Sequence, residues 1–185
     1  MKYPFNNFYE LITHQAKKRK KKVALLVDDE KITYGETLEK VDKLAGFLAD
    51  KGGKKGDKIA LFLRNSPEFI YTIFAVSKLG AILVPINTFL KEDELSYILE
   101  DSGSSVLLAS SIYEKVVNSS KASTLCNFIL WEDKTSVEGE QHLSLDEALQ
   151  SEKSVEHTVR KLEDTAVLIY TSGTTGMPKG VMLTH

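Results

Sequence analysis

The apolar residues of this chain recur with two different spacings, and segments of the two kinds alternate along the sequence. One helix is predicted over residues 33–52, because its apolar side chains fall on a single face: Leu38, Val41, Leu44, Ala45 and Leu48. Other segments are short and apolar nearly throughout, which is typical of strands buried on both faces of a sheet. The pattern therefore predicts buried strands in turn with amphipathic helices.

Four such strand segments follow one another between residues 57 and 131: DKIALFLRN, AILVPIN, SSVLLAS and NFILW. Helices are expected between them, over residues 66–80, 91–103 and 111–121. The first has Ser66 at its N-cap, Pro67 at its first position and Gly80 as its C-cap. Strands that alternate with helices of this length indicate βαβ units. We therefore predict an α/β fold with a mostly parallel sheet flanked by helices.

The N-terminal region predicts a helix that is capped by Asn6 or Asn7, and then a hairpin over residues 23–34 that turns at 28–30. Between them lies the basic run KKRKKK, residues 17–22. Such a run could bind a membrane surface or a nucleic acid. We favour a solvated helix end, because basic residues stabilise a helix C-terminus.

Residues 132–163 are polar and predict a surface connection with one short helix near 145–149. A new apolar segment starts at Thr165. We therefore divide the chain into an N-terminal α/β subdomain, residues 1–164, and the start of the next sheet, residues 165–185.

Composition narrows the possible partners and location. The chain has 185 residues, 24 basic and 26 acidic side chains, and a formal net charge of -2. A dedicated nucleic-acid binder would be strongly basic. Cys126 is the only cysteine, so no intramolecular disulfide can form, which fits a cytoplasmic setting. Neither a signal peptide nor a membrane-spanning apolar run is recognisable.

The segment from Thr171 to Gly180, TSGTTGMPKG, carries the most suggestive chemistry. It follows a predicted strand, and it combines three glycines, four hydroxyl side chains and Lys179. Glycines let backbone amides approach a ligand, and hydroxyls and a cation suit an oligophosphate. An ordinary turn between two strands is the alternative, although such turns are shorter and simpler.

The spacing of this segment excludes two common nucleotide-binding motifs. A Walker-type loop needs four residues between its glycines and then Lys followed by Ser or Thr. Here two residues separate Gly173 from Gly176, and Gly180 follows Lys179. No G-x-G occurs in the chain, so the dinucleotide fingerprint is absent as well.

The last sixteen residues, YTSGTTGMPKGVMLTH, resemble the phosphate-binding signature of the AMP-forming acyl-adenylate ligases. Residues 31–108 also follow the N-terminal region of that superfamily in order and spacing. The resemblance implies the N-terminal part of a large adenylation domain. It further implies an enzyme that joins a carboxylate to ATP, releases pyrophosphate, and then passes the acyl group to a thiol, usually that of CoA.

The family loop holds the β- and γ-phosphates of ATP, with Mg²⁺ assisting. Carried over to this sequence, the resemblance assigns that role to Thr171, Ser172, Gly173, Thr174, Thr175, Gly176 and Lys179. In relatives a histidine near the catalytic cleft ends the following strand, which makes His185 a candidate for the substrate cleft. A disordered terminal residue is the other interpretation of His185. The residues that the family uses for adenine, ribose, Mg²⁺ and catalysis are expected beyond residue 185.

Several alternatives remain open at this stage. GTTG, KGVMLTH and VPINTFLKEDELSYIL look most like fatty-acyl or aryl-CoA synthetases, so a fatty acid is the expected substrate; an amino-acid-adenylating domain is the nearest alternative. A non-catalytic assembly domain that keeps a vestigial loop, and that forms a homodimer, is a different class. An ATP-dependent phosphotransferase is disfavoured by the failed Walker spacing. We expect the 185-residue chain to be inactive in adenylation by itself.

Overall fold

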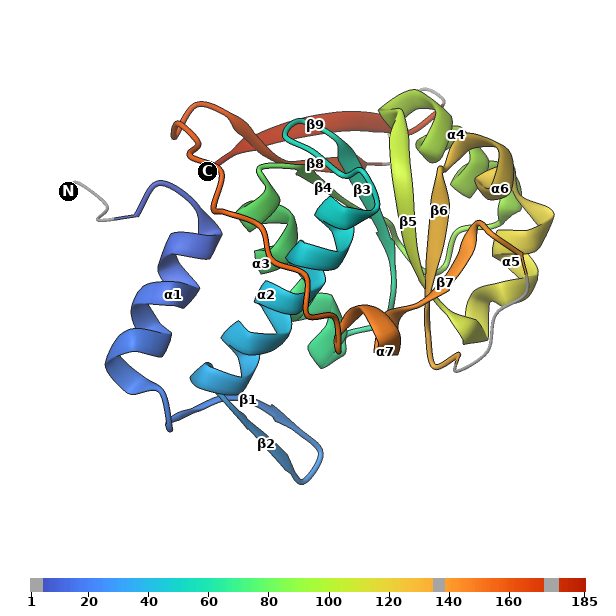
Figure 1. Ribbon diagram of the computed structural model, residues 1–185. Coiled ribbons are helices and arrows are strands. Elements are labelled where there is room, and N and C mark those ends of the chain that lie inside the picture. The colour runs from blue at the N-terminus through green and yellow to red at the C-terminus, as the bar shows by residue number, and fades with distance from the viewer. Residues whose placement is uncertain (1–4, 135–138, 172–176) are drawn as a thin grey trace.

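A seven-stranded sheet forms the centre of the computed structural model, which describes residues 5–134, 139–171 and 177–185. The strands lie in the order β7-β6-β5-β3-β4-β8-β9, and all neighbours are parallel except β8 and β9 (Figure 1). Their bounds are β3 (Lys58–Phe62), β4 (Ile82–Pro85), β5 (Ser104–Ser110), β6 (Phe128–Glu132), β7 (His142–Ser144), β8 (Thr165–Thr171) and β9 (Lys179–Thr184). The predicted α/β class with a mostly parallel sheet is confirmed.

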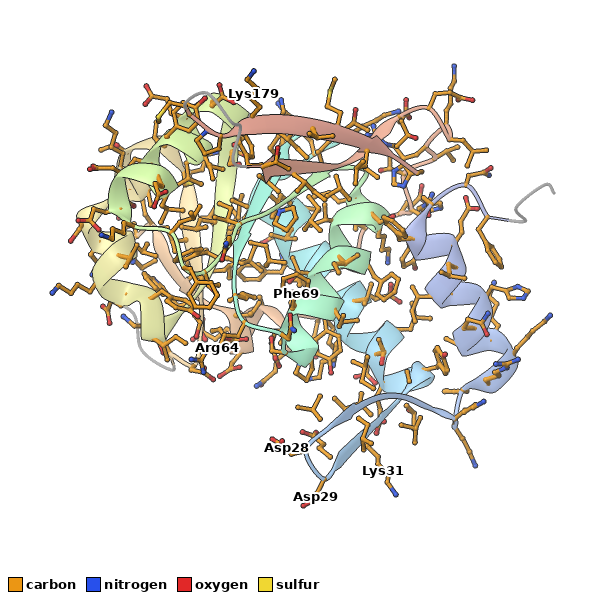
Figure 2. All side chains as sticks on the ribbon, turned by 180° about the vertical axis from the view of Figure 1, so that it is seen from behind. Asp28, Asp29, Lys31, Arg64, Phe69 and Lys179 are labelled. Atoms are coloured by element: carbon orange, nitrogen blue, oxygen red, sulfur yellow. The ribbon has the colours of Figure 1, made fainter. Side chains whose placement is uncertain are left out.

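Helices cover both faces of this sheet. One face carries α2 (Tyr34–Asp50), α3 (Pro67–Leu79) and the short α7 (Leu145–Ala148), with α1 (Phe8–Arg19) outside them. The other face carries α4 (Glu92–Ser102), the 3-10 turn η1 (Ser111–Tyr113), α5 (Glu114–Ser119) and α6 (Ala122–Leu125). A separate hairpin of β1 (Val23–Val27) and β2 (Glu30–Thr33) extends from the helices, with Asp28 and Asp29 at its turn (Figure 2).

Alternation along the buried strands builds two cores. In β3, Ile59 and Leu61 face the α2–α3 side, whereas Ala60 and Phe62 face the α4–α6 side. The same alternation continues through β5 and β6, where Trp131 is completely buried on the α4–α6 side. Strands that are covered on both faces read as continuous apolar runs, which is why the sequence revealed them.

The ends of α3 match the sequence prediction. Ser66 Oγ accepts a hydrogen bond of 3.2 Å from the Phe69 amide, and Pro67 occupies the first turn. Gly80 ends the helix with φ 73°, a left-handed conformation that glycine adopts without a steric penalty. Asn7 is the N-cap of α1, which decides between the two candidates.

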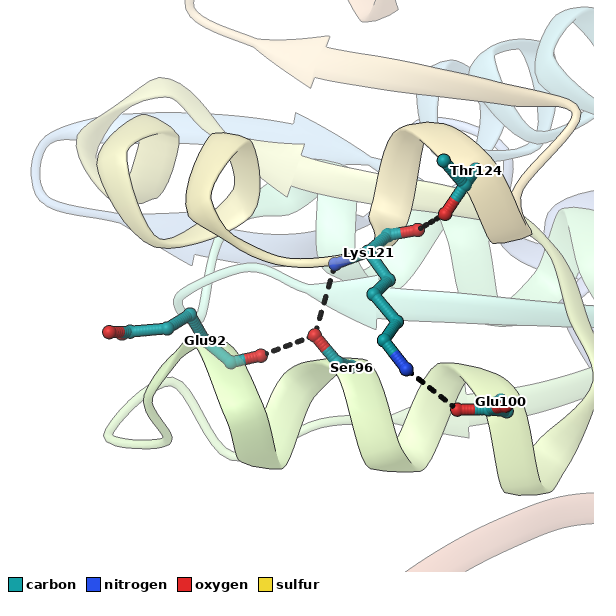
Figure 3. Close-up of polar contacts among 5 residues, drawn as sticks. All are labelled: Glu92, Ser96, Glu100, Lys121 and Thr124. Atoms are coloured by element: carbon teal, nitrogen blue, oxygen red, sulfur yellow. Dashed lines mark hydrogen bonds and ion pairs between the residues drawn. The ribbon is translucent and has the colours of Figure 1, made fainter.

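The helix predicted over residues 111–121 is confirmed only in part: the 3-10 turn η1 and then α5 occupy residues 111–119, the helix ends there, and the separate α6 begins at Ala122. Figure 3 shows what holds the break: Ser96 Oγ on α4 accepts a 3.0 Å hydrogen bond from the Lys121 amide and donates one of 2.6 Å to the Glu92 carbonyl. Lys121 also pairs with Glu100 at 3.4 Å, and its carbonyl accepts from Thr124. Contacts with α4 thus override local helix periodicity.

The polar segment 132–163 contains a strand that the sequence analysis missed. β7 pairs in parallel with β6 and extends the sheet at one edge. Its three residues are too few for a period-two pattern, so composition alone did not reveal it. The predicted short helix is present as α7.

Residues 150–164 then cross the outer side of α2 and α3, where they make specific contacts. Gly46 of α2 lies directly against the backbone of Lys153 and Ser154. The Thr158 amide donates a hydrogen bond of 3.0 Å to the Lys78 carbonyl at the end of α3. Arg160 is 7% exposed, and its Nη2 donates 2.9 Å to the Thr165 carbonyl, so it connects this crossing segment to the start of β8.

β8 does not begin a new sheet, which corrects the expected start of the next sheet at Thr165. It pairs in parallel with β4 through Leu83 and Val167, and β9 then pairs with it in antiparallel fashion. Strand neighbours are set by tertiary packing, which the hydrophobic pattern does not encode. The proposed division of the chain at residues 164 and 165 stays a prediction.

In the part of the chain that the structure describes, no helix combines the length and apolar character needed to cross a bilayer.

Candidate phosphate-binding hairpin

The segment singled out by the sequence lies in the β8–β9 hairpin. Thr171 pairs with Lys179, and Tyr170 pairs with Gly180, so the two strands bring Thr171 and Lys179 together at the mouth of the loop. Both side chains are exposed, and Lys179 stands where β9 begins (Figure 2). The other predicted phosphate ligands, Ser172 to Gly176, lie outside the described residues.

Two side chains of α4 anchor this hairpin. Tyr97 donates a hydrogen bond of 3.2 Å to the carbonyl of Pro178. One helical turn later, Asp101 accepts a hydrogen bond of 2.6 Å from the hydroxyl of Tyr170. The two anchors hold the end of β8, at Tyr170, and the residue just before β9, Pro178, to one helix.

The Tyr170 phenol is kept neutral at this contact. Burial first, and then the hydrogen bond to Asp101 and its charge, raise the pKa of Tyr170 well above its usual value. A neutral phenol remains a donor to the Asp101 carboxylate across the physiological pH range. The anchor is therefore a fixed, charge-assisted hydrogen bond.

Gly180 makes room for this tyrosine. A Cβ at Gly180 would lie 3.0 Å from Leu168 Cδ1 and 3.3 Å from Tyr170 Cζ, closer than side chains normally approach. The absence of a side chain here lets the Tyr170 ring lie over β9 and reach α4. The sequence analysis counted Gly180 among the glycines that let backbone amides approach a ligand, and the structure shows that it also has a packing role.

His185 is at the opposite end of β9 from Lys179, about 20 Å away for a six-residue strand. Its ring contacts Phe8 edge-on at 5.8 Å between centroids, and it lines an apolar pocket with Leu11 and Leu162. Burial, and then Arg160, lower the pKa of His185, which favours the neutral imidazole. The structure thus does not bring His185 to the candidate phosphate ligands, and its role in a substrate cleft stays a prediction.

Sequence reasoning missed Tyr97 and Asp101 as residues that position this site. Their spacing of four places them on one face of α4, and this was the available signal. Nothing in the sequence, however, says that this face meets the β8–β9 hairpin.

The arrangement suits an oligophosphate. A ligand at the hairpin mouth would meet the Thr171 hydroxyl and the Lys179 ammonium on neighbouring strands, and both are exposed to receive it. An ammonium is a strong binder of phosphate oxygens, and a threonine hydroxyl can donate to them. The exposed carboxylate of Asp101, on the neighbouring helix, already accepts a hydrogen bond from Tyr170.

Known proteins resemble this chain in sequence. The crotonobetaine/carnitine–CoA ligase of Salmonella heidelberg (strain SL476) is 36% identical over 159 residues, which are 83% of this chain and 30% of that enzyme. The chain therefore spans about 30% of the length of the curated relative that it matches.

Solved structures resemble it in fold. An anthranilate–CoA ligase, AuaEII, in complex with anthranoyl-AMP superposes with a TM-score of 0.89 and 28% identity, over 100% of this chain and 36% of that one. A fatty acyl CoA synthetase of Mycobacterium tuberculosis superposes with a TM-score of 0.82 and 31% identity, over 96% of this chain and 34% of that one.

The sequence model of the AMP-binding enzymes matches residues 12–185, which is nearly the whole chain and includes the β8–β9 hairpin. The chain therefore belongs to the AMP-binding enzyme family and corresponds to the N-terminal part of such an enzyme.

Proposed function

We propose that the β8–β9 hairpin binds the β- and γ-phosphates of ATP in an AMP-forming acid–thiol ligase. The observation that carries this proposal is the pairing of Thr171 with Lys179, which places a hydroxyl and an ammonium side by side at the loop mouth. Membership of the AMP-binding enzymes supports it. The proposed ligands are Thr171, Ser172, Gly173, Thr174, Thr175, Gly176 and Lys179.

The proposed reaction has two steps. A carboxylate oxygen of the acid attacks the α-phosphorus of ATP, the bond to the β-phosphate oxygen breaks, and pyrophosphate leaves. The sulfur of CoA then attacks the acyl carbon, the thiol proton is released, and AMP leaves. In the first step Thr171 and Lys179 would stabilise the charge that develops on the departing pyrophosphate.

Mg²⁺, when bound with ATP, supplies further neutralisation of the phosphate charge. Among the described residues no three acidic, histidine or cysteine side chains are placed to hold a metal ion. In this chain, Thr171 and Lys179 would help to fix the orientation of the phosphates to which the ion is bound.

We propose a fatty acid as the carboxylate substrate and the cytoplasm as the location. The fatty acyl CoA synthetase among the structural relatives supports the first. The buried, unpaired Cys126 supports a reducing compartment. A panel of fatty, aromatic and amino acids, tested for acid-dependent pyrophosphate release by a protein of the relatives' length, would distinguish these substrate classes. Release with amino acids alone would favour the adenylating-domain alternative.

Titration calorimetry tests the phosphate-binding role. We expect pyrophosphate and ATP to bind more tightly than AMP, and Thr171→Val and Lys179→Gln each to weaken pyrophosphate binding severalfold. Lys161→Gln, an exposed lysine outside the hairpin, is the matched control. Absence of binding by both pyrophosphate and ATP would contradict the role of the hairpin.

The 185-residue chain is proposed to be inactive in adenylation by itself, because it represents 30% of the relative's length. Pyrophosphate release from ATP with each acid should stay at the background rate. Sustained turnover by this chain would overturn that statement, while leaving the binding experiment untouched.

A non-catalytic assembly domain is the second candidate, and the surface of β9 favours it. The whole strand is exposed, including Val181 at 45%, Met182 at 71% and Leu183 at 44%. An edge strand whose outer side has no partner, and whose side chains are apolar, can pair with a second copy of the chain. Sedimentation analysis would show a homodimer that Met182→Lys dissociates; a monomer at all concentrations would dismiss this candidate.

A further inference from the structure

A histidine of the crossing segment, residues 150–164, contacts the start of α1. Nε2 of His157 lies 2.9 Å from Nδ2 of Asn7, the residue that caps α1, although 150 positions separate the two residues in sequence. Asn7 is 5% exposed, and His157 is half-buried. In Figure 1 the crossing segment, drawn in orange, passes beside the start of α1. This contact lies outside the candidate phosphate-binding hairpin.

The hydrogen bonds of Asn7 fix the protonation of this histidine. The backbone N–H of Glu10, which can only donate, bonds to Asn7 Oδ1 at 2.9 Å, so Oδ1 is the acceptor and Nδ2 is the amide donor. His157 Nε2 must therefore accept from Asn7, and it can do so only with a free lone pair. The contact requires a neutral imidazole that carries its proton on Nδ1.

A protonated His157 is incompatible with this arrangement. A proton on Nε2 would face the NH₂ group of Asn7, so that two donors would oppose each other. Rotation of the Asn7 amide by half a turn would offer an acceptor to His157. It would also turn the NH₂ group toward the Glu10 amide and remove the N-cap of α1. The positive charge on His157 and the cap of α1 therefore exclude each other.

The surroundings of His157 favour the neutral ring. Burial first lowers the pKa of His157, the carboxylate of Glu10 on α1 raises it, and the ammonium of Lys78 on α3 lowers it; the net shift is downward. The ring of Tyr9 packs against the imidazole at 5.1 Å between centroids. The Tyr9 phenol donates to Asp42 of α2, which also pairs with Lys78. The environment and the contact with Asn7 thus select the same form of the histidine.

We propose that the contact between Asn7 and His157 is a pH-sensitive switch, which holds the first turn of α1 on the crossing segment while His157 is neutral and releases that turn when His157 gains a proton. The contact stabilises the fold fully above the pKa of an unfolded histidine, about 6.5, and this contribution is lost as pH falls through the folded pKa. The same turn carries Phe8, whose ring contacts His185 at the end of β9. Release of the turn removes this contact as well.

NMR spectroscopy of the 185-residue chain tests the proposal. The nitrogen-15 chemical shifts of His157 should show a proton on Nδ1 at neutral pH and a pKa below that of an ordinary histidine. The protection factor of the Glu10 amide against hydrogen exchange should fall about fivefold as His157 is protonated, which is the effect of losing an N-cap. A proton on Nε2 at neutral pH, or a protection factor that does not follow the titration of His157, would overturn the proposal.

Asn7→Asp should reverse the response, because it keeps the N-cap and changes the atom that faces His157. One carboxylate oxygen accepts from the Glu10 amide, and the other accepts from a protonated His157. The pKa of His157 should rise above the ordinary value, and the Glu10 amide should become better protected as pH falls. If His157 titrates in this variant as it does in the wild type, Asn7 does not control its protonation and the switch is refuted.

His157→Gln is the matched control, since its amide oxygen can accept from Asn7 at every pH. The protection factor of the Glu10 amide should then be independent of pH. His185, whose pKa burial also lowers, is unchanged in this variant. A fall in protection that persists would therefore assign the pH response to another group and exclude His157 as its origin.

Discussion

The hydroxyl of Tyr170 on β8 donates a hydrogen bond of 2.6 Å to the carboxylate of Asp101 on α4, and this contact ties the candidate phosphate-binding hairpin to the helical layer. Tyr97 of the same helix donates a hydrogen bond to the carbonyl of Pro178, the residue just before β9. The positions of Thr171 and Lys179 thus depend on a helix that contributes no predicted phosphate ligand.

Tyr170→Phe should loosen the hairpin without creating a cavity. We expect pyrophosphate affinity to fall severalfold, and the free energy of unfolding to fall by about 1–2 kcal/mol, since a hydrogen bond to a charged group is lost. Calorimetry and urea denaturation measure the two effects. Tyr34→Phe, on α2 and away from the hairpin, should change neither; an equal loss of affinity in that variant would contradict the anchoring role of Tyr170.

Gly46→Ala should destabilise the fold, although alanine is favoured over glycine by about 1 kcal/mol inside a helix. A Cβ at this position would collide with the Lys153 carbonyl and lie 2.9 Å from the Ser154 nitrogen. We expect the free energy of unfolding to fall by about 1–3 kcal/mol through overpacking. Urea denaturation measures it, and Ala49→Gly on the same helix calibrates the propensity effect alone. A stabilised Gly46→Ala would show that the crossing segment moves away freely.

Glu132 should make stability depend on pH in the direction opposite to most carboxylates. It is 9% exposed, and its carboxylate accepts a hydrogen bond of 2.8 Å from Ser66 Oγ. Burial raises the pKa of Glu132 above the ordinary value, while hydrogen bonds from Ser66 and Ser110 oppose that shift. A raised carboxyl pKa favours the protonated form in the folded state. Its stabilising contribution is full below the unfolded pKa and is lost as pH rises through the folded pKa.

Glu132→Gln isolates this contribution, because the amide oxygen can still accept from Ser66. The difference in unfolding free energy, variant minus wild type, should rise with pH from about 4 and level off above the folded pKa. Denaturation curves between pH 4 and pH 8 measure it. A difference that falls as pH rises would mean that Glu132 is stabilised as an anion.

Cys126 should be unreactive in the native protein. It is 3% exposed, its thiol donates to the Ser104 carbonyl at 3.6 Å, and burial raises its pKa to about 12. The thiolate that attacks an aromatic disulfide reagent is therefore scarce and shielded. Labelling should be slow without denaturant and fast and stoichiometric in guanidinium chloride. Fast native labelling would indicate opening of the core between β5 and α6.

Strong local signals made much of the fold predictable. Ser66, Pro67 and Gly80 delimit α3 by their own backbone chemistry, and β3, β4, β5 and β6 read as continuous apolar runs because both their faces are covered. β7 and the break at Lys121 carry no such signal. The first is three residues long, and the second is held by Ser96 of another helix.

The candidate site was predictable only in its composition. Thr171 and Lys179 stand out in the sequence, and the return of β9 explains why they meet. Their supports, Tyr97 and Asp101, are distant in sequence and come together through packing of α4 on the hairpin.

The crossing segment, residues 150–164, is polar, yet specific contacts hold it against the rest of the molecule. Its backbone fits against Gly46, its Thr158 amide is tied to Lys78, and Arg160 connects it to β8. The segment therefore connects the outer helices α2 and α3 to the start of β8. A protease that readily cleaves exposed linkers should therefore cleave this segment slowly. A residue inserted between Lys153 and Arg160 would displace β8, the first strand of the hairpin.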